Sequence, residues 1–581
     1  MIDRSVMQKS IAEPNRWKIG LLGAVFAALA LKFGVLAFQA VPFNADEAIV
    51  ALMARHILQG GRPLFFYGQA YMGSLDAFLV AVMFKLVGYQ IWGIRLVQIV
   101  LYALTLVTTG WLGKALTGKW QVGVIAAWLL AIPTVSVTLY TTVSMGGYGE
   151  MLLIGNLILL VTISITLDFG TKISRRGYFK WFGLGFLSGF GLWVFGLTLV
   201  YSVPALGYLT WYFLKARSQS GVRDKSEKNQ NVNKSERNPV RINFCITTRQ
   251  WGLLIAGAIS GALPWIAYAQ QKGLSILLNE LGGAGISGVE STSLAAQILQ
   301  HGLNLGLFGT TVMLGLRPAW EIRWLGLPLA PLVLSFWIGV LIFAIKKTSR
   351  DLKTDPGSGE YSHSPLLSGL ILTLVAGFVF SPFGVDPSGR YFLPIAVVMA
   401  LFAAQAVWEW QKKWKTYTVI AVCLVLAFNL WGTLQTVVRT PPGVTTQFDA
   451  VTQIDHRYDQ ELIQFLQANG EDRGYTNYWV AYPLAFLSAE DLVFVPRLPY
   501  HPDLRYTNRD DRYEPYQQAV EGARRTAYIT TKNPRLDGQL RTGFQSLGVQ
   551  WKEKVIGDYQ VYYHLSEKVD PDQIGLGGGE G

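Results

Sequence analysis

The stretch KIGLLGAVFAALALKFGVLAFQAVPFNADE, residues 18–47, joins a long apolar run to two adjacent carboxylates. Residues 18–40 are long enough to cross a bilayer as a single helix, which needs about 20 mostly apolar residues. Ten further runs of this kind follow, at 91–113, 119–136, 150–168, 178–196, 197–215, 250–270, 324–346, 364–382, 391–410 and 416–436. The sequence therefore predicts an α-helical polytopic membrane protein with about eleven transmembrane helices.

The overall composition agrees with this fold class. Of 581 residues, 51% are hydrophobic and only 15% are charged, which is too little charged surface for a set of soluble domains of this length. The formal net charge is +12, but lysines and arginines concentrate in alternate loops, at 114–119, 172–180, 215–249, 346–350 and 412–415. Short cytoplasmic loops of membrane proteins carry such an excess. We therefore expect a multi-pass protein of the cell membrane with a cytoplasmic N-terminus, and no nucleic-acid partner.

The polar character of the last part of the chain predicts a second domain. Residues 1–436 form the expected membrane domain, and residues 437–581 an extracytoplasmic α/β domain. Within the latter the pattern predicts a helix and three strands, at 461–467, 492–495, 527–530 and 560–563. The 215–249 loop is rich in Ser, Asn, Lys and Glu, a composition typical of a flexible linker.

Carboxylates beside predicted spans are the first candidate site residues, because ionisable groups are costly in a bilayer. Asp46 and Glu47 follow the first span directly, and Glu150 opens the fourth. Asp76 starts a further apolar stretch. Helix capping and a favourable helix dipole offer an alternative explanation for each of them.

Cations and aromatic residues gather in the same predicted outer region. The first outer loop contains Arg55, His56, Arg62, Tyr67 and Gln69. Arg390 and Tyr391 open a later span, where an interfacial arginine and a belt tyrosine are also common. A site for a lipid-phosphate sugar needs these residue types, since cations bind the phosphate, aromatic rings stack on the sugar, and a carboxylate deprotonates an acceptor hydroxyl.

Three of these motifs together resemble those of a known family. The segment DEA at 46–48 with ARHILQGGRPLFFYGQAYMGSLDA at 54–77 resembles the first outer loop of GT-C membrane glycosyltransferases of the family 39/83-like group. That group includes protein O-mannosyltransferases and lipid A aminoarabinose transferases. YGE at 148–150 and GRYFLP at 389–394 resemble two later motifs of the same family.

The resemblance implies a GT-C-like fold and an inverting transfer of a sugar from a polyprenyl-phosphate donor in the bilayer. The acceptor would be a cell-envelope glycan, a lipid or a protein. By the same resemblance Asp46 is the general base, Glu47 a neighbouring donor or acceptor contact, and Glu150 a second acidic residue. Arg390 is a phosphate ligand, together with Arg55 or Arg62. No cofactor is predicted, although the family pattern leaves a divalent metal between Asp46 and Glu150 open.

Some features of the chain depart from this pattern or fit other functions. No loop is long enough for the β-trefoil domain of protein O-mannosyltransferases, and the lysine and double-proline segment of the aminoarabinose branch is absent. Lys32 inside the first span favours a transporter or a lipid-linked sugar flippase, and a non-catalytic scaffold is a further alternative. The Gly-rich segment within 271–323 is expected to form a mobile flap over the site.

Overall fold

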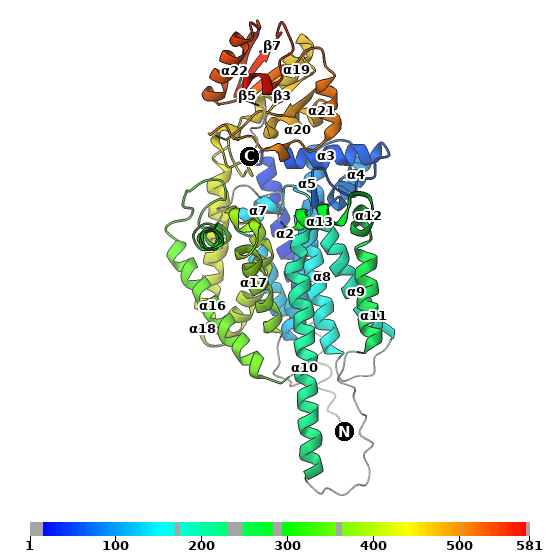
Figure 1. Ribbon diagram of the computed structural model, residues 1–581. Coiled ribbons are helices and arrows are strands. Elements are labelled where there is room, and N and C mark those ends of the chain that lie inside the picture. Colours follow the sequence, from blue (N-terminus) through cyan, green and yellow to red (C-terminus); the bar gives the residue numbers. More distant parts are fainter. Residues whose placement is uncertain are drawn as a thin grey trace.

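The chain folds into a bundle of long helices with a small α/β unit at one end (Figure 1). A computed structural model describes residues 16–168, 175–229, 247–282, 293–355, 363–501 and 503–576. The extension of the helix over Leu199–Asn229 lies at the opposite end of the molecule from the α/β unit (Figure 1).

Every predicted span falls on a helix or a pair of helices. The helices are α2 (Arg16–Ala37), α5 (Ile91–Thr117), α6 (Trp120–Ala131), α8 (Tyr148–Leu167), α9 (Arg175–Val194), α10 (Leu199–Asn229), α11 (Thr248–Gly261), α12 (Leu263–Lys272), α16 (Ala330–Lys353), α17 (Ser364–Val379) and α18 (Leu393–Val437). The last two predicted spans are the two parts of α18, which is interrupted at Trp414, where φ is −130° and ψ is 54°. The predicted span 250–270 is the pair α11 and α12, bent by 58°.

Within the described residues, six helices are long and apolar enough to cross a membrane, or seven if the bent pair is counted as one span. Their outward faces carry large apolar side chains, such as Phe26 of α2, which is 73% exposed, and Leu341 of α16. Such a surface suits lipid rather than water. The protein is therefore a multi-pass membrane protein, while the count of eleven spans stays a prediction.

The loop predicted as a flexible linker is partly helical. Helix α10 continues through residues 215–229 before it ends at Asn229. Extending an existing helix adds one hydrogen bond per residue without a new nucleation cost, and the Lys, Arg, Glu and Gln of this segment are good helix formers. The remainder of the predicted linker, residues 230–246, lies outside the described residues.

Glycine allows α9 and α11 to pack backbone against backbone. A Cβ atom at Gly185 of α9 would overlap the backbone of Leu254, and one at Gly257 of α11 would overlap the backbone of Phe182. Small residues at such crossings are typical of membrane helices, because close approach supplies the van der Waals contact that holds them together.

Short elements lie across the end of the bundle that carries the α/β unit (Figure 1). They are α3 (Ala45–Leu58), β1 (Phe65–Phe66), β2 (Gln69–Gly73), α4 (Leu75–Val87), α7 (Val135–Tyr140), α13 (Leu274–Leu281), α14 (Leu294–Leu303), η2 (Asn304–Gly309), α15 (Thr310–Met313), η3 (Pro382–Val385) and η4 (Arg390–Phe392). Helix α3 begins at an Asn44 cap, whose side chain accepts a hydrogen bond from the Glu47 amide at 3.0 Å. Capping therefore does not require the Asp46 carboxylate, which is left for another role.

The C-terminal α/β unit (residues 459–576) contains a five-stranded sheet in the order β4-β3-β5-β7-β6. Its elements are α19 (Asp459–Asn469), β3 (Arg473–Thr476), α20 (Tyr478–Leu487), β4 (Val493–Pro496), α21 (Glu514–Glu521), β5 (Ala527–Thr531), α22 (Pro534–Ser546), β6 (Lys552–Ile556) and β7 (Tyr559–Tyr563). Strands β4, β3 and β5 are parallel, whereas β7 is antiparallel to both β5 and β6. The four predicted elements correspond to α19, β4, β5 and β7, and the sequence pattern did not reveal β3 or β6.

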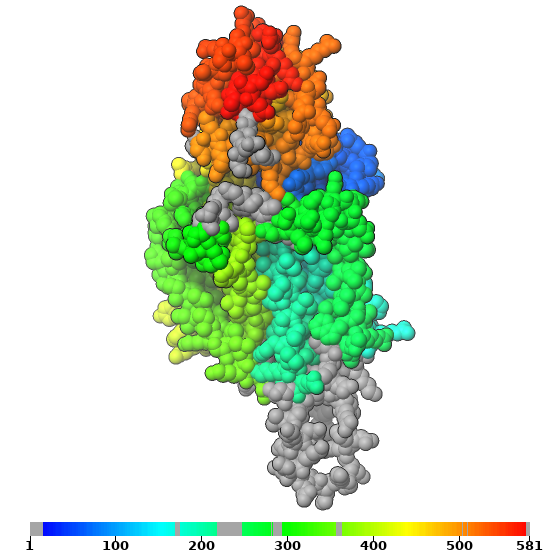
Figure 2. Space-filling model, in the orientation of Figure 1, coloured from blue at the N-terminus to red at the C-terminus, as the bar shows by residue number. Residues whose placement is uncertain are grey.

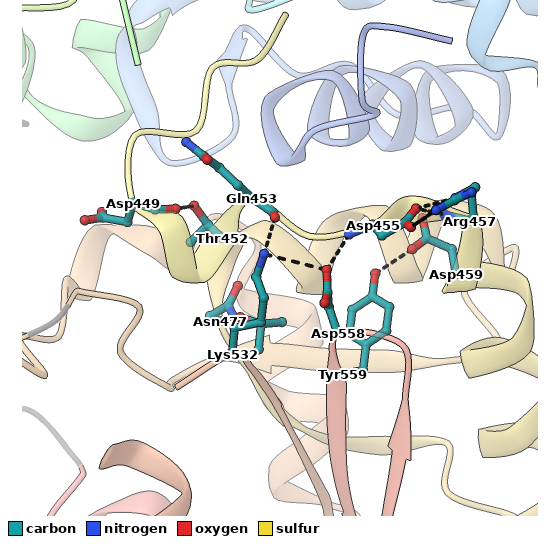
Figure 3. A network of polar contacts seen from close by, with 11 residues as sticks. Asp449, Thr452, Gln453, Asp455, Arg457, Asp459, Asn477, Lys532, Asp558 and Tyr559 are labelled. Carbon is teal, nitrogen blue, oxygen red and sulfur yellow. Dashed lines mark hydrogen bonds and ion pairs between the residues drawn. The ribbon is translucent and has the colours of Figure 1, made fainter. Parts of the chain in front are cut away.

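A polar network fastens the chain between α18 and α19 to the sheet (Figure 3). Lys532 donates to the Gln453 carbonyl, and the Asp455 amide donates to Asp558 at 2.8 Å. Tyr559 donates to Asp459 at 2.5 Å. In the space-filling view the unit rests directly on the first outer loop, drawn in blue (Figure 2). We call this contact region the junction.

The close crossing of α9 and α11 can be tested with two glycines of one helix. Gly257→Leu is expected to lower the free energy of unfolding by about 1–3 kcal/mol or more, because the new side chain separates the two backbones. Gly252→Leu is the matched control, since nothing lies within 4 Å of a Cβ at Gly252. Thermal unfolding in detergent measures both, and equal melting temperatures for the two variants would contradict the packing.

Candidate active site

Four charged groups act on the hydroxyl of the half-buried Tyr71 in β2. Burial raises the pKa of Tyr71, Arg390 and Arg512 lower it, and Asp46 and Glu280 raise it. These four side chains come from the starts of η4 and α3, from α13, and from the loop before α21. The junction therefore brings cations and carboxylates from distant parts of the chain into one polar site.

Asp46 lies in the first turn of α3 and is half-buried. The Tyr478 hydroxyl at the start of α20 donates to Asp46 Oδ1 at 2.6 Å. Burial and the Asp46 charge raise the pKa of Tyr478 well above its usual value, so this hydroxyl stays protonated and keeps donating. Asn477, whose side chain accepts from the Trp479 amide at 3.0 Å, caps α20 and fixes the position of Tyr478.

Arg512 of the α/β unit also belongs to this polar site. Its guanidinium lies 5.5 Å from the Tyr478 ring centroid, and its Nη1 and Nη2 donate to the Gln69 side-chain oxygen at 2.6 and 2.8 Å. The Tyr482 hydroxyl accepts from the Arg512 amide at 2.6 Å and donates to the Asp510 carbonyl at 2.9 Å. Arg512 is therefore fixed at both backbone and side chain.

Sequence reasoning placed Gln69 in the site but did not find Arg512. The only signal was a charged stretch, RDDRYEP at 509–515, which resembles any solvent-exposed loop. Although burial lowers the pKa of Arg512, the nearby Tyr478, Tyr71, Asp510 and Asp46 raise it above its usual value.

Arg390 and Tyr391 face the same site from η4. Arg390 Nε forms an ion pair with Asp386 Oδ2 at 2.5 Å, and its guanidinium lies 5.1 Å from the Tyr391 ring centroid. The turn before it is made by Gly389 with a φ of 78°, a conformation that other residues rarely adopt. The predicted position of this pair beside the other candidate residues agrees with the structure, while its role in phosphate binding stays a prediction.

An apolar cavity of about 210 Å³ opens next to this polar site. Its lining includes Phe195, Leu197, Leu199, Val200, Leu374, Gly377, Phe378 and Phe383. Tyr71 and Tyr391 also line it, and the Tyr391 ring adjoins the Arg390 guanidinium. A hydrocarbon chain between α10 and α17 would thus have its polar end among charged side chains.

Glu47 has a different position from its neighbour Asp46. Its side chain is fully buried, and Arg95 of α5 donates to Glu47 Oε1 at 3.0 Å and to Oε2 at 2.9 Å. Consecutive helical residues point about 100° apart, so Glu47 faces the bundle while Asp46 faces the site. The structure therefore gives Glu47 a buried ion pair that fastens α3 to α5, while its contact with donor or acceptor stays a prediction.

Glu150 belongs to a separate buried carboxyl pair with Asp76. Asp76 accepts hydrogen bonds from Ser144 at 2.5 Å, Gln98 at 3.0 Å and the Gly146 amide at 3.3 Å. Burial raises the pKa of Asp76 to about 6, although these hydrogen bonds lower it. Two adjacent buried carboxyl groups share a proton more readily than they both ionise. Asp76 holds the 144–147 turn through these bonds, while the catalytic role of Glu150 stays a prediction.

Arg55 and His56 of the first outer loop contact the α/β unit. Arg55 Nη1 lies 3.5 Å from Glu490 Oε2, and His56 Nε2 lies 3.0 Å from Glu490 Oε1. His56 Nδ1 forms a hydrogen bond with the Tyr67 hydroxyl at 2.9 Å. Arg55 is nine residues from Asp46, which is about 13 Å along a helix. These three side chains therefore lie at an interface with Glu490 and not at Tyr71.

Arg62 is exposed and donates to the Gly61 carbonyl at 2.8 Å. The structure thus places it after the C-terminal end of α3, while the phosphate-binding role considered for it stays a prediction. Among the residues described, no three His, Cys, Asp or Glu side chains gather as metal ligands, and the predicted absence of a cofactor stays a prediction.

Lys32, the residue that favoured transport, has a structural explanation. Its ammonium group donates to the Thr141 carbonyl and hydroxyl, both at 2.7 Å, and to the Thr142 hydroxyl at 2.9 Å. It thereby links α2 to the turn after α7. Of the flap predicted within 271–323, residues 283–292 lie outside the described residues, and its mobility stays a prediction. In its described first part, Glu280 forms an ion pair with Arg509 of the α/β unit.

Comparison with known proteins shows which solved structures have a similar fold. No protein-family model matches the chain, and no curated protein matches it in sequence. A crystal structure of ArnT from Cupriavidus metallidurans bound to undecaprenyl phosphate is similar, with a TM-score of 0.53, 11% identity, and coverage of 93% of this chain and 97% of that one. The apo form of the same protein has a TM-score of 0.55 at 10% identity, over 96% and 99% of the two chains.

An oligosaccharyltransferase from Archaeoglobus fulgidus also matches, with a TM-score of 0.48 and 11% identity over 89% of this chain and 70% of that one. The likeness to ArnT extends over nearly the whole of both chains, the α/β unit included. The chain therefore has the fold of the GT-C membrane glycosyltransferases, as the three sequence motifs predicted.

The buried carboxyl pair makes a prediction about pH. Because the pKa of Asp76 is raised to about 6 by burial, the folded protein holds a proton that the unfolded chain releases near pH 3.9. Stability is therefore expected to fall as the pH rises from about 4 to about 6, by roughly 3 kcal/mol.

Asp76→Asn should flatten this part of the stability profile, measured by chemical unfolding across the pH range. Asp472→Asn, which changes an exposed aspartate of the α/β unit, is the control and should keep the wild-type slope. The assignment fails if Asp76→Asn and wild type lose stability in parallel.

Proposed function

We propose that the protein is an integral membrane glycosyltransferase. It transfers a sugar from a polyprenyl-phosphate donor to an acceptor hydroxyl outside the cytoplasm, on a glycan, a lipid or a protein. One observation carries the proposal: Tyr71 and Tyr391 line the apolar cavity and also adjoin the charged groups, since Arg390 lies over the Tyr391 ring and both Arg390 and Asp46 act on Tyr71. The fold supports it further, since the similar ArnT structure is described as bound to undecaprenyl phosphate.

The donor would lie with its polyprenyl chain in the cavity between α10 and α17. Its phosphate would then reach Arg390, where charge-assisted hydrogen bonds to a guanidinium are strong. Arg390 is already paired with Asp386, which orients the guanidinium before the donor arrives. Arg512, which also acts on Tyr71, would add a second positive charge near the sugar and phosphate.

The reaction requires a base and a stabilised leaving group. Asp46 accepts the proton of the acceptor hydroxyl as that oxygen bonds to the anomeric carbon, while the bond from this carbon to the phosphate oxygen breaks. The bonding electron pair leaves with the polyprenyl phosphate, whose growing negative charge Arg390 stabilises. Attack from the face opposite the leaving group inverts the anomeric centre. Tyr478 holds one oxygen of Asp46 and so orients the other for the proton.

The proposal predicts different defects for the base and for the phosphate ligand. The experiment uses the full chain in nanodiscs with a panel of radiolabelled polyprenyl-phosphate sugars. Asp46→Asn should keep donor binding and reduce turnover, including slow donor hydrolysis, by about 10²–10⁴-fold. Arg390→Ala should weaken donor binding by about 10- to 100-fold, the loss typical of a hydrogen-bonded charge. Arg62→Ala changes an exposed arginine of the first outer loop and should leave both unchanged.

Two results would overturn this function. One is a well-folded wild-type protein that binds no polyprenyl-phosphate sugar. The other is donor turnover that is the same in Asp46→Asn as in Arg62→Ala. Movement of the intact donor across the bilayer, without cleavage, would instead identify a flippase.

A further inference from the structure

A polar cavity of about 600 Å³ lies in the α/β unit, and Arg512 forms part of its wall. Arg497, directly after β4, and Glu514 and Gln517 of α21 line it. Ligands of parallel sheets bind outside the carboxyl ends of the strands, and β3 and β4 are parallel. The volume is within the range of about 300–1,000 Å³ that is typical of small-molecule sites.

We propose that this cavity binds a neutral carbohydrate portion of the acceptor. The inference rests on the proposed glycosyl transfer and adds to it the class of the acceptor and the place where it is held. The donor would then bind in the helix bundle, and the acceptor would bind in the α/β unit.

The chemistry of the walls fits a polyhydroxyl ligand. Sugar hydroxyls both donate and accept hydrogen bonds, and the cavity offers both kinds of partner: guanidinium donors from Arg497, carboxylate acceptors from Asp511 and Glu514, and an amide from Gln517 that does both. Tyr506 adds an aromatic ring, which can pack on the apolar face of a sugar.

The charge of the walls argues against an anionic ligand. Two arginines, Arg497 and Arg512, face three carboxylates, Asp511, Glu514 and Asp572, so the formal sum is −1. Arg497 is also held by Asp572, with Nη2 to Oδ1 at 2.9 Å. A phosphate or a uronate would have to displace this pairing and approach the remaining carboxylates, which neutral hydroxyls need not do.

Arg512 connects the cavity to the active site. It lines the cavity, while its Nη groups donate to Gln69 and its guanidinium lies over the Tyr478 ring. Tyr478 in turn donates to Asp46. The wall of the cavity is thus connected to the base through two side chains, Arg512 and Tyr478.

The test measures glycan binding by the full chain in nanodiscs. The probe is an array that displays neutral, uronate-containing and phosphorylated oligosaccharides at high density, which makes weak binding visible through avidity. The cavity variant carries Glu514→Ala and Gln517→Ala, which lie outside the proposed donor site. The control carries Glu461→Ala and Gln467→Ala, two exposed residues of α19 with the same chemistry. Donor binding is measured in parallel on every protein.

We expect wild type and control to bind one or more neutral glycans, and the cavity variant to bind them at least tenfold more weakly with unchanged donor binding. Absence of glycan binding, selective binding of charged glycans, or equal binding by cavity variant and control would each overturn the inference. Intact donor binding in those cases would leave the proposed function standing. Cavity-dependent glycan binding without any donor binding would instead refute the proposed function.

Discussion

The hydrogen bond from Tyr478 to Asp46 joins residues 432 positions apart and holds the site together. It brings the first turn of α3 against the first turn of α20, and so fixes the α/β unit on the bundle. Arg512 reaches Gln69 and Tyr71 only because α20 lies there. The geometry of the polar site therefore depends on docking between two parts of the chain that the sequence keeps far apart.

Adjacent residues show how helix geometry divides roles at this docking surface. Asp46 and Glu47 have the same chemistry, but the turn of α3 directs one to Tyr478 and the other to Arg95. A buried carboxylate is stable only when it is paired, and Arg95 pairs both oxygens of Glu47. Asp46 is half-buried, and the neutral hydroxyl of Tyr478 donates to only one of its oxygens. This arrangement suits the proton transfer proposed for Asp46.

The sequence predicted the spans and the fold well because both depend on local patterns. Runs of apolar residues form helices. Of the charged residues beside span ends, Asp46 and Arg390 lie at the polar site, and Glu47 lies behind it, facing the bundle. The side-chain partners could not be predicted in this way. Arg95, Glu490 and Arg512 lie 48, 434 and 443 residues from Glu47, His56 and Gln69 respectively, and only the tertiary fold shows that His56 docks a domain while Arg512 faces Tyr71.

The docking also has a consequence for biosynthesis. Ribosomes produce α3 before the α/β unit, and domains generally fold in the order of synthesis. Until the last 120 or so residues have been synthesised and folded, Asp46 lacks Tyr478 and Gln69 lacks Arg512. A nascent or truncated chain would therefore contain the bundle and its apolar cavity without an assembled polar site, so the chain gains its complete site only after its C-terminal unit has folded.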